Sequence, residues 1–207
     1  MDTINFNLAV GVTSFHIAKD GIWYQEGFPH KITRNSPSAE FNVSTRPSGG
    51  NWEYSAGILY LGKVTSSAEA IRDEEYNIKT KKCDSIPISH CATVTYNGSG
   101  TVSGLTFAAR RYYGSWFAEY GLILERSTWQ VDMPNFTQYI NGVEPRYHYH
   151  VEHKTKIQVL PTLAVGYKFK DSPLSLRVGV YPTAGHGDTF QPIYRGVSPK
   201  IDLSYRF

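Results

Sequence analysis

Residues 156–184 read KIQVLPTLAVGYKFKDSPLSLRVGVYPTA, two runs of alternating apolar residues on either side of a turn. Apolar residues on one face of the two runs are Ile157, Val159, Leu163, Val165, Tyr167 and Phe169, then Leu174, Leu176, Val178 and Val180. Period-two alternation around a turn predicts a β-hairpin. Each run also places a proline, Pro161 or Pro182, on its apolar face. Because proline cannot donate to a ladder, these two residues demand an explanation.

The turn fixes how the two strands face each other. Pro173 has no N–H, so a four-residue connection that closes between Phe169 and Leu174 is expected. In that register Pro161 lies opposite Pro182, where two backbone hydrogen bonds would otherwise form. The seam between the strands is therefore predicted to be open there, as lateral entry of a lipid chain into a closed wall requires. The alternative is a pair of prolines tolerated at a bulge or a frayed rim.

The same alternation recurs along the chain. Strands are expected at about 5–17, 37–46, 51–63, 101–112 and 115–126, two more within 156–184, and one at 197–207. Tight turns alternate with long connections, and the connection 64–100 contains a segment with helical character, SSAEAIRDEEY at 66–76. This asymmetry is typical of outer-membrane barrels. We predict one all-β domain, residues 1–207, folded as an eight-stranded antiparallel up-and-down transmembrane β-barrel with short periplasmic turns and long extracellular loops.

The two faces of the strands differ in chemistry. The polar face mixes small residues with charges of both signs, including Glu119, Arg177 and Asp202. This mixture suits a packed lumen, whereas a soluble lipocalin-like barrel would turn its apolar face inward. The strand lengths and the aromatic C-terminal strand favour the membrane form. Side chains fill the interior of an eight-stranded barrel, so a wide pore is not expected. Function is then left to the loops, a small lumen pocket or the lipid-facing wall.

Composition and charge limit the partners and the cellular compartment of the protein. The net charge of +3 is too small to indicate nucleic-acid binding. The two cysteines, Cys83 and Cys91, lie close together in KKCDSIPISHC and predict a disulfide formed in an oxidising compartment, the alternative being two free thiols. The histidines of YHYHVEH (147–153) are expected in a solvated loop without a metal ion. No signal-peptide pattern is seen, which by itself indicates a soluble cytoplasmic β-protein and also fits the mature form of an exported one. Together with the barrel pattern, we expect the mature form of a Gram-negative outer-membrane protein.

The hairpin also carries a family resemblance. VLPTLAVGYKF (159–169) and VYPTA (180–184) resemble the corresponding hairpin of the PagP family, the outer-membrane lipid A palmitoyltransferases, in which prolines on these strands flank a lateral opening to the outer leaflet. Weaker similarities lie at NSPSAEFNVSTR (35–46), at GNW (50–52) and at SFH (14–16), where His16 corresponds to the family's catalytic histidine. The family's Asp-Ser pair after the third strand is not matched, because KVTSS (63–67) offers Ser66 without an aspartate.

The resemblance implies acyl transfer from a phospholipid to lipid A. It makes His16 and Ser66 candidate catalytic residues and Pro161, Pro182 and Pro37 candidate gate residues. Strand parity points Leu59, Leu61, Ile123 and Leu160 inward, where they either line an acyl slot or only pack the lumen. Outer-membrane phospholipid and lipid A or lipopolysaccharide are the expected partners of a monomer, with no cofactor, metal or nucleic acid. The competing hypothesis is a non-enzymatic surface barrel whose loops act in adhesion or in resistance to serum or antimicrobial peptides.

Overall fold

The computed structural model describes residues 3–17, 29–48, 50–71, 76–77, 82–83, 93–138, 146–183, 193 and 196–207, without the side chains of 70–94 and 135–150. Its strands are β1 (Thr3–Ser14), β2 (His30–Thr33), β3 (Asn35–Arg46), β4 (Trp52–Ile71), β5 (Tyr76–Asn77), β6 (Lys82–Cys83), β7 (Thr93–Tyr113), β8 (Trp116–Gln138), β9 (Arg146–Lys168), β10 (Leu174–Thr183) and β11 (Gly196–Arg206). The described residues are thus all-β. They include no helix with the length and apolar character needed to cross a membrane.

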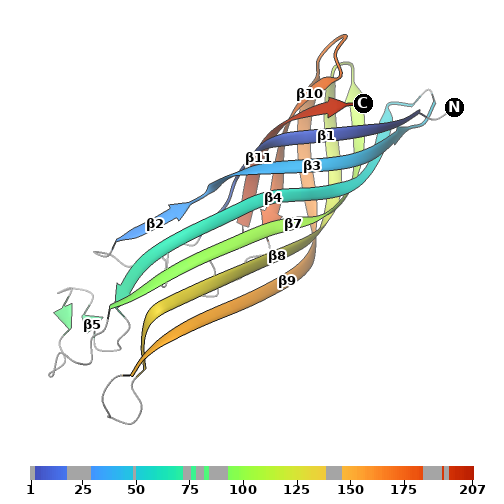
Figure 1. Cartoon of the computed structure of the whole chain (residues 1–207). Helices are drawn as coiled ribbons and strands as arrows, with labels where there is room; N and C mark the ends of the chain where they lie inside the picture. Colours follow the sequence, from blue (N-terminus) through green and yellow to red (C-terminus); the bar gives the residue numbers. More distant parts are fainter. Residues whose placement is uncertain are drawn as a thin grey trace.

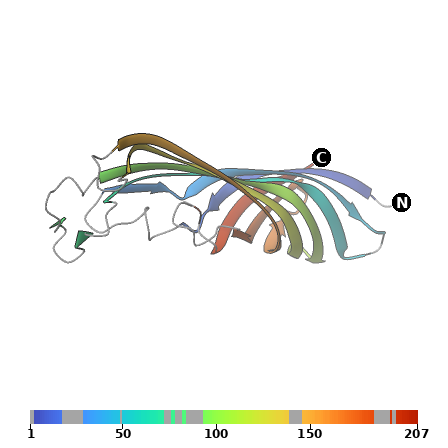
Figure 2. The ribbon, with the colours of Figure 1, turned by 90° about the horizontal axis from the view of Figure 1, so that it is seen from below.

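Nine of these strands form a single antiparallel sheet that closes on itself. Their order is β2-β4-β3-β1-β11-β10-β9-β8-β7, and pairing between β4 and β7 completes a ring. Since β2 joins the sheet through β4, the ring itself contains the other eight strands. Figure 1 shows β1, β3, β4, β7, β8 and β9 in front, and Figure 2 shows the curvature of the sheet from below. A small two-stranded sheet, β5-β6, stands apart from the ring.

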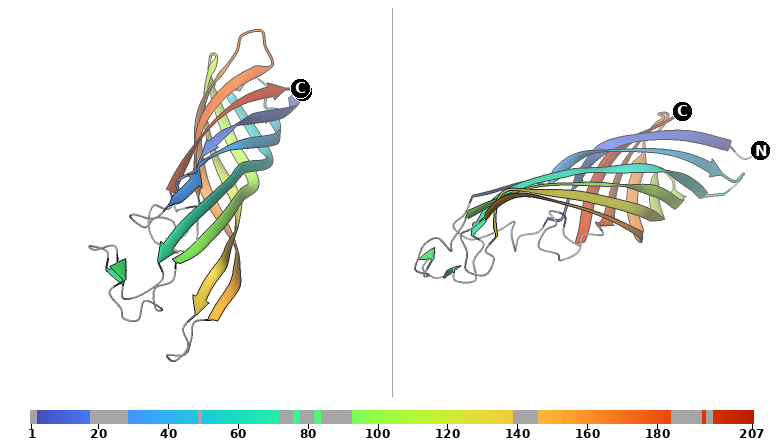
Figure 3. Two further views of the ribbon diagram at one scale, coloured as in Figure 1. Left: turned by 60° about the vertical axis from the view of Figure 1, so that its left-hand side comes forward. Right: turned by 60° about the horizontal axis from the view of Figure 1, so that its bottom comes forward.

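Four strands are longer than the alternation alone predicts. The strands β4, β7, β8 and β9 continue past the ring as a curved sheet (Figures 1 and 3). The predicted helical character of 66–76 is wrong for the described part, because Ser66–Ala68 pair with Tyr96–Gly98 of β7 and with β2. The prediction of a histidine-bearing loop is also wrong, because 147–153 belong to β9. Cross-strand pairing overrides local preference in both places.

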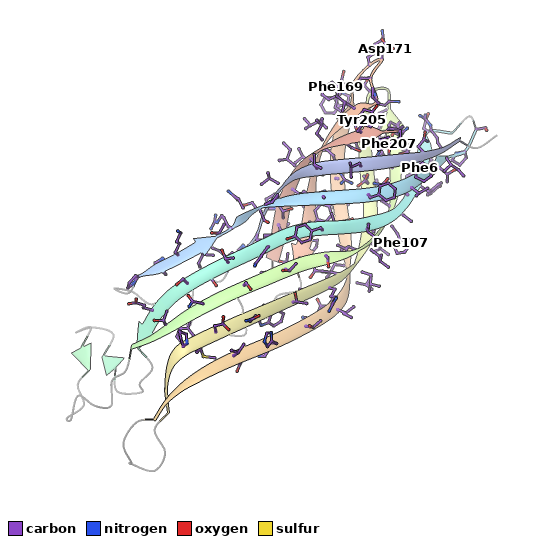
Figure 4. All side chains as sticks on the ribbon, viewed as in Figure 1. Phe6, Phe107, Phe169, Asp171, Tyr205 and Phe207 are labelled. Carbon is purple, nitrogen blue, oxygen red and sulfur yellow. The ribbon has the colours of Figure 1, made fainter. Side chains whose placement is uncertain are left out.

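The short connections between neighbouring ring strands, β3–β4, β7–β8 and β9–β10, lie at the end of the ring that holds both termini (Figure 1). In the β9–β10 turn the N–H of Phe169 donates to the carbonyl of Leu174 at 3.1 Å, so the predicted four-residue connection is confirmed. Asp171 adopts a φ of 55°, and the Ser172 hydroxyl accepts from the N–H of Leu174 at 3.2 Å. Figure 4 shows Asp171 at the tip of this turn, with Phe169, Tyr205 and Phe207 near the same end.

The ring turns its apolar face outward, as predicted, and its polar face inward. Exposed side chains on the outer face include Phe6, Leu8, Val10, Phe41, Ile58, Leu105, Phe107, Leu122, Val165, Val178 and Leu203. Buried polar or charged side chains on the inner face include Asn7, Glu40, Asn42, Glu53, Glu119, Arg177, Lys200 and Asp202. On these strands the distribution of burial is the reverse of that in a lipocalin-like barrel, which turns its apolar face inward.

Candidate lateral opening and lumen site

The ladder between β9 and β10 is interrupted at the two prolines. It runs from Ser175 opposite Lys168 to Val180 opposite Leu163 and ends there. Both strands continue beyond this point. β10 stays paired with β11 as far as Thr183, and β9 stays paired with β8 over the rest of its length. The observed register puts Pro161 across from Pro182, as the turn geometry predicted.

The prolines reduce the cost of leaving this seam unpaired. Because Phe169 donates toward β10, the odd-numbered residues of β9 direct their backbone polar groups to that strand. Pro161 falls in this series, so its missing N–H is one that would point into the seam. Pro182 stands in the same position on the other strand. Only carbonyl oxygens then face the opening at this pair, and no buried donor goes unsatisfied.

A hollow in the outer wall lies directly below the opening, on the turn side. Its volume is about 380 Å³, and it is lined by β8, β9 and β10. Leu163 and Val180, the last pair of the ladder, form one end of it. Its exposed outer lining includes Leu163, Val165, Val178 and Val180, and the buried Ala164 and Gly179 lie between them. An extended apolar chain can therefore lie along the wall up to the opening.

Inside the ring an apolar cluster lies on the loop side of the lumen. It consists of Phe15, Ile17, Leu59, Leu61, Val64, Val102, Ile123, Tyr181 and Ile193, with Ile32 and Leu160 packed against it. All four predicted slot residues belong to this group, and Leu61 and Ile123 are 0% exposed. Leu160 and Tyr181 come from β9 and β10, next to the two prolines. The opening and the apolar interior are thus adjacent.

Sequence reasoning missed several members of this cluster. Val102 and Tyr181 share the parity of inward-facing neighbours and were accessible to the same argument. Val64 was not, because a bulge between Tyr60 and Gly62 shifts the alternation of β4 by one residue. Phe15 and Ile17 continue the inward parity of the predicted strand 5–17, although β1 ends at Ser14, whereas Ile193 lies outside the predicted strands and joins Ile17 through an isolated bridge.

The turn-side half of the lumen is filled by ion pairs. Four cations and four anions alternate there: Arg110, Arg177, Lys200 and Arg206 with Glu40, Glu53, Glu119 and Asp202. Arg177 is central. It contacts Glu40, lies 2.8 Å from Glu119 and lies 3.1 Å from Asp202. This neutral network forms a polar floor beneath the apolar cluster and fills that part of the interior with side chains.

The two predicted catalytic residues are in different environments. His16 is exposed at the loop-side end of β1, and its backbone N–H donates to the Ser198 hydroxyl at 3.4 Å. The imidazole ring of His16 lies over Gly196, and a Cβ added to Gly196 would lie 2.8 Å from that ring. Ser66 is buried on the inner face of the extended sheet and donates to the carbonyl of Gly98 at 3.5 Å. The described contacts do not join His16 to Ser66.

The third predicted gate residue, Pro37, lies in another part of the wall. It pairs with Val12 of β1, whereas the β3–β4 ladder begins only at Ala39 opposite Tyr60. Near Pro37 the hydroxyl of Ser36 accepts from the N–H of Lys63 at 2.8 Å, replacing a backbone acceptor. The strands β1 and β11 separate this interruption from β10, so Pro37 does not belong to the β9–β10 opening.

Two further sequence predictions concern a disulfide and the absence of a metal site. The predicted disulfide between Cys83 and Cys91 lies outside the described side chains, and none is seen among those described. No group of ligands suitable for a metal ion occurs in the described ranges.

Neither a scan against protein-family models nor a search of curated proteins found a match for this chain. The resemblance to the PagP family therefore rests on the quoted residues alone.

Proposed function

We propose that this chain is an integral β-barrel of a bacterial outer membrane that admits a lipid chain between β9 and β10. The observation that carries this proposal is the end of the ladder at Leu163 and Val180, beside facing prolines and an apolar interior. A gap in a closed wall exposes the lumen to the surrounding medium at that level. If the medium is lipid, the entering molecule is a hydrocarbon chain.

The outer surface supports a membrane location. Large exposed apolar areas mark membrane or protein contact, and here they surround the ring. On β8 the outward residues are apolar from Trp116 to Leu124, close to the roughly nine to eleven residues that a tilted crossing needs. Aromatic rings gather at the turn end, as in the girdles of outer-membrane barrels. The ring centroids of Trp116 and Tyr167 lie 5.0 Å apart, and those of Tyr205 and Phe207 lie 4.9 Å apart.

The sharpest form of the proposal is acyl transfer from a phospholipid to a hydroxyl group of lipid A by a monomer. The hydroxyl oxygen attacks the ester carbonyl and forms the new ester bond. The lysophospholipid then leaves with the proton. His16 is the proposed base for that proton, and Ser66 is the second proposed catalytic residue. Leu59, Leu61, Ile123 and Leu160 would hold the acyl chain above the polar floor.

Reconstitution tests this proposal directly. The purified chain is placed in bilayers with phospholipid and lipid A, and acylated lipid A is measured by mass spectrometry. A product is expected, and His16→Ala should lower its rate about a hundredfold or more. His30→Ala, which alters an exposed histidine on β2, is the matched control. Ser66→Ala is assayed in parallel. Absence of product under conditions where a PagP-family enzyme works ends the acyltransferase proposal.

One observation favours a second candidate, a non-enzymatic surface barrel. The extension of β4, β7, β8 and β9 has a polar outer face, with Lys63, Thr65, Asn97 and Glu69 exposed. Such a sheet would stand beyond the bilayer, where it could contact other molecules in adhesion or in resistance to serum or antimicrobial peptides. A heat-stable barrel that inserts into vesicles but makes no acylated product would favour this candidate.

A further inference from the structure

The outer wall carries a second hollow, distinct from the one at the β9–β10 opening. Its volume is about 630 Å³, and its lining extends across β1, β3, β4, β7, β8 and β9. Most of the lining is apolar and exposed, as at Leu8, Phe41, Ile58, Leu105 and Leu124. A concave apolar surface on a membrane-spanning wall offers more contact to a hydrocarbon chain than a flat wall does.

One cation lies at the loop-side rim of this hollow. Arg126 is exposed and lines it, together with Ser103, which faces Arg126 directly across the β7–β8 ladder. Within the described part of the chain the Arg126 guanidinium has no hydrogen-bonding, ionic or ring partner. Arg111, an exposed arginine on β7, is different, because it stacks over the rings of Trp52 and Tyr113.

The height of Arg126 on the wall matches that of a lipid headgroup. The outward residues of β8 are apolar up to Leu124, and they are Arg126, Thr128, Gln130 and Asp132 beyond it. Arg126 is thus the first polar residue past the apolar band. A guanidinium binds phosphate through two parallel hydrogen bonds, and the Ser103 hydroxyl adds a third donor beside it.

We propose that this hollow is a binding site for a phosphorylated membrane lipid, with a chain along the apolar wall and the phosphate on Arg126 and Ser103. The site rests on the membrane-spanning part of the proposed function and is independent of acyl transfer. It also lies close to the opening. Ile157, opposite Arg126 in the ladder, lines the same hollow and belongs to the strand that carries Pro161.

Lipid binding to the detergent-purified full chain, measured by native mass spectrometry, tests the headgroup contact. The probes are dipalmitoyl phosphatidic acid and dipalmitoylglycerol, which have the same chains with and without phosphate. The wild-type chain should prefer the phosphorylated lipid. Arg126→Gln should weaken its binding about tenfold, as expected for loss of a charged hydrogen bond. Arg111→Gln, the matched control at the other end of the apolar band, should change it less than twofold.

A second pair of variants tests the chain contact. Ala39→Phe fills the hollow at an exposed position of β3, whereas Val43→Phe enlarges a residue on the same face outside it. Only Ala39→Phe should weaken binding of both lipids. Equal binding of the two lipids by wild type, or unchanged binding in Arg126→Gln, overturns the proposal. If Arg126→Gln fails to fold, Ser103→Ala replaces it, with a loss of about threefold or more expected and no loss counting against the site.

These results separate the lipid site from the enzyme. A wild-type chain that makes no acylated product but binds phosphatidic acid through Arg126 retains the site and loses the acyltransferase proposal. A chain that acylates lipid A with unchanged lipid binding in Arg126→Gln does the reverse. Insertion is scored separately, as resistance of the folded barrel to detergent denaturation before heating.

Discussion

Replacing both facing prolines should close the opening between β9 and β10. The double substitution Pro161→Val and Pro182→Val restores two N–H groups at a position where the register calls for two hydrogen bonds. At about 0.5–1.5 kcal/mol each, the new bonds contribute roughly 1–3 kcal/mol to closure of the seam. The loss of two prolines also frees the unfolded chain, at roughly 0.4–1 kcal/mol per residue. These opposing effects leave the global stability within about 2 kcal/mol of wild type.

Local hydrogen exchange is therefore the decisive measurement. A closure free energy of 1–3 kcal/mol slows exchange of the new amides at positions 161 and 182 by roughly 5- to 150-fold relative to an open segment. Exchange is followed by NMR in nanodiscs, and acyl transfer is assayed on the same samples. The transfer rate should fall along with exchange, because the chain loses its entrance. Pro199→Val is the control, since the β10–β11 ladder already continues past Pro199 to Thr183.

Two outcomes would refute this reasoning. If the new amides exchange as fast as those of an unpaired loop, the prolines are not what holds the seam open. If the amides are protected but transfer continues at the wild-type rate, the lipid chain enters elsewhere. The interruption near Pro37 is then the next place to examine, because the β3–β4 ladder is also broken there.

Three further predictions concern stability, each measured as the free energy of unfolding in urea with the chain in lipid vesicles. Arg177→Met should cost about 3–5 kcal/mol because it leaves Glu40, Glu119 and Asp202 short of a buried cation, and a loss below 1 kcal/mol would show that Lys200 and Arg110 suffice. Ile123→Ala should cost about 2–5 kcal/mol, because the Ile123 side chain is 0% exposed in the apolar cluster. The control Leu122→Ala on the outer face should cost less, and equal losses would contradict the interior packing. Gly62→Ala should cost about 1–3 kcal/mol, because φ at Gly62 is +133° and Ser36 occupies the space that the new Cβ would need. The control Gly114→Ala, where an added Cβ meets nothing within 4 Å, should cost less, and the reverse order would refute the bulge geometry.

Much of the ring follows from the sequence, because period-two alternation reports directly which residues share a face. The hairpin shows this best. Its alternation gave the strands, Pro173 excluded a two-residue turn, and the turn then fixed Pro161 opposite Pro182. The same parity placed Leu59, Leu61 and Ile123 inside. Local chemistry suffices for these features, since a strand's two faces and a tight turn involve only nearby residues.

The tertiary structure decided what depends on distant partners. Residues 66–71 have helical character alone, but pairing with β7 and β2 makes them strand. The bulge at Gly62 moves the Val64 side chain to the inside, and period-two alternation alone does not predict this shift. Arg126 reads as one more charge on a polar stretch until the sheet sets it at the rim of an apolar hollow. Ser66 illustrates the same limit, because the bulge at Gly62 reverses the parity of β4 and puts this side chain on the buried face. His16 differs, because it keeps the outward parity of β1 and is exposed.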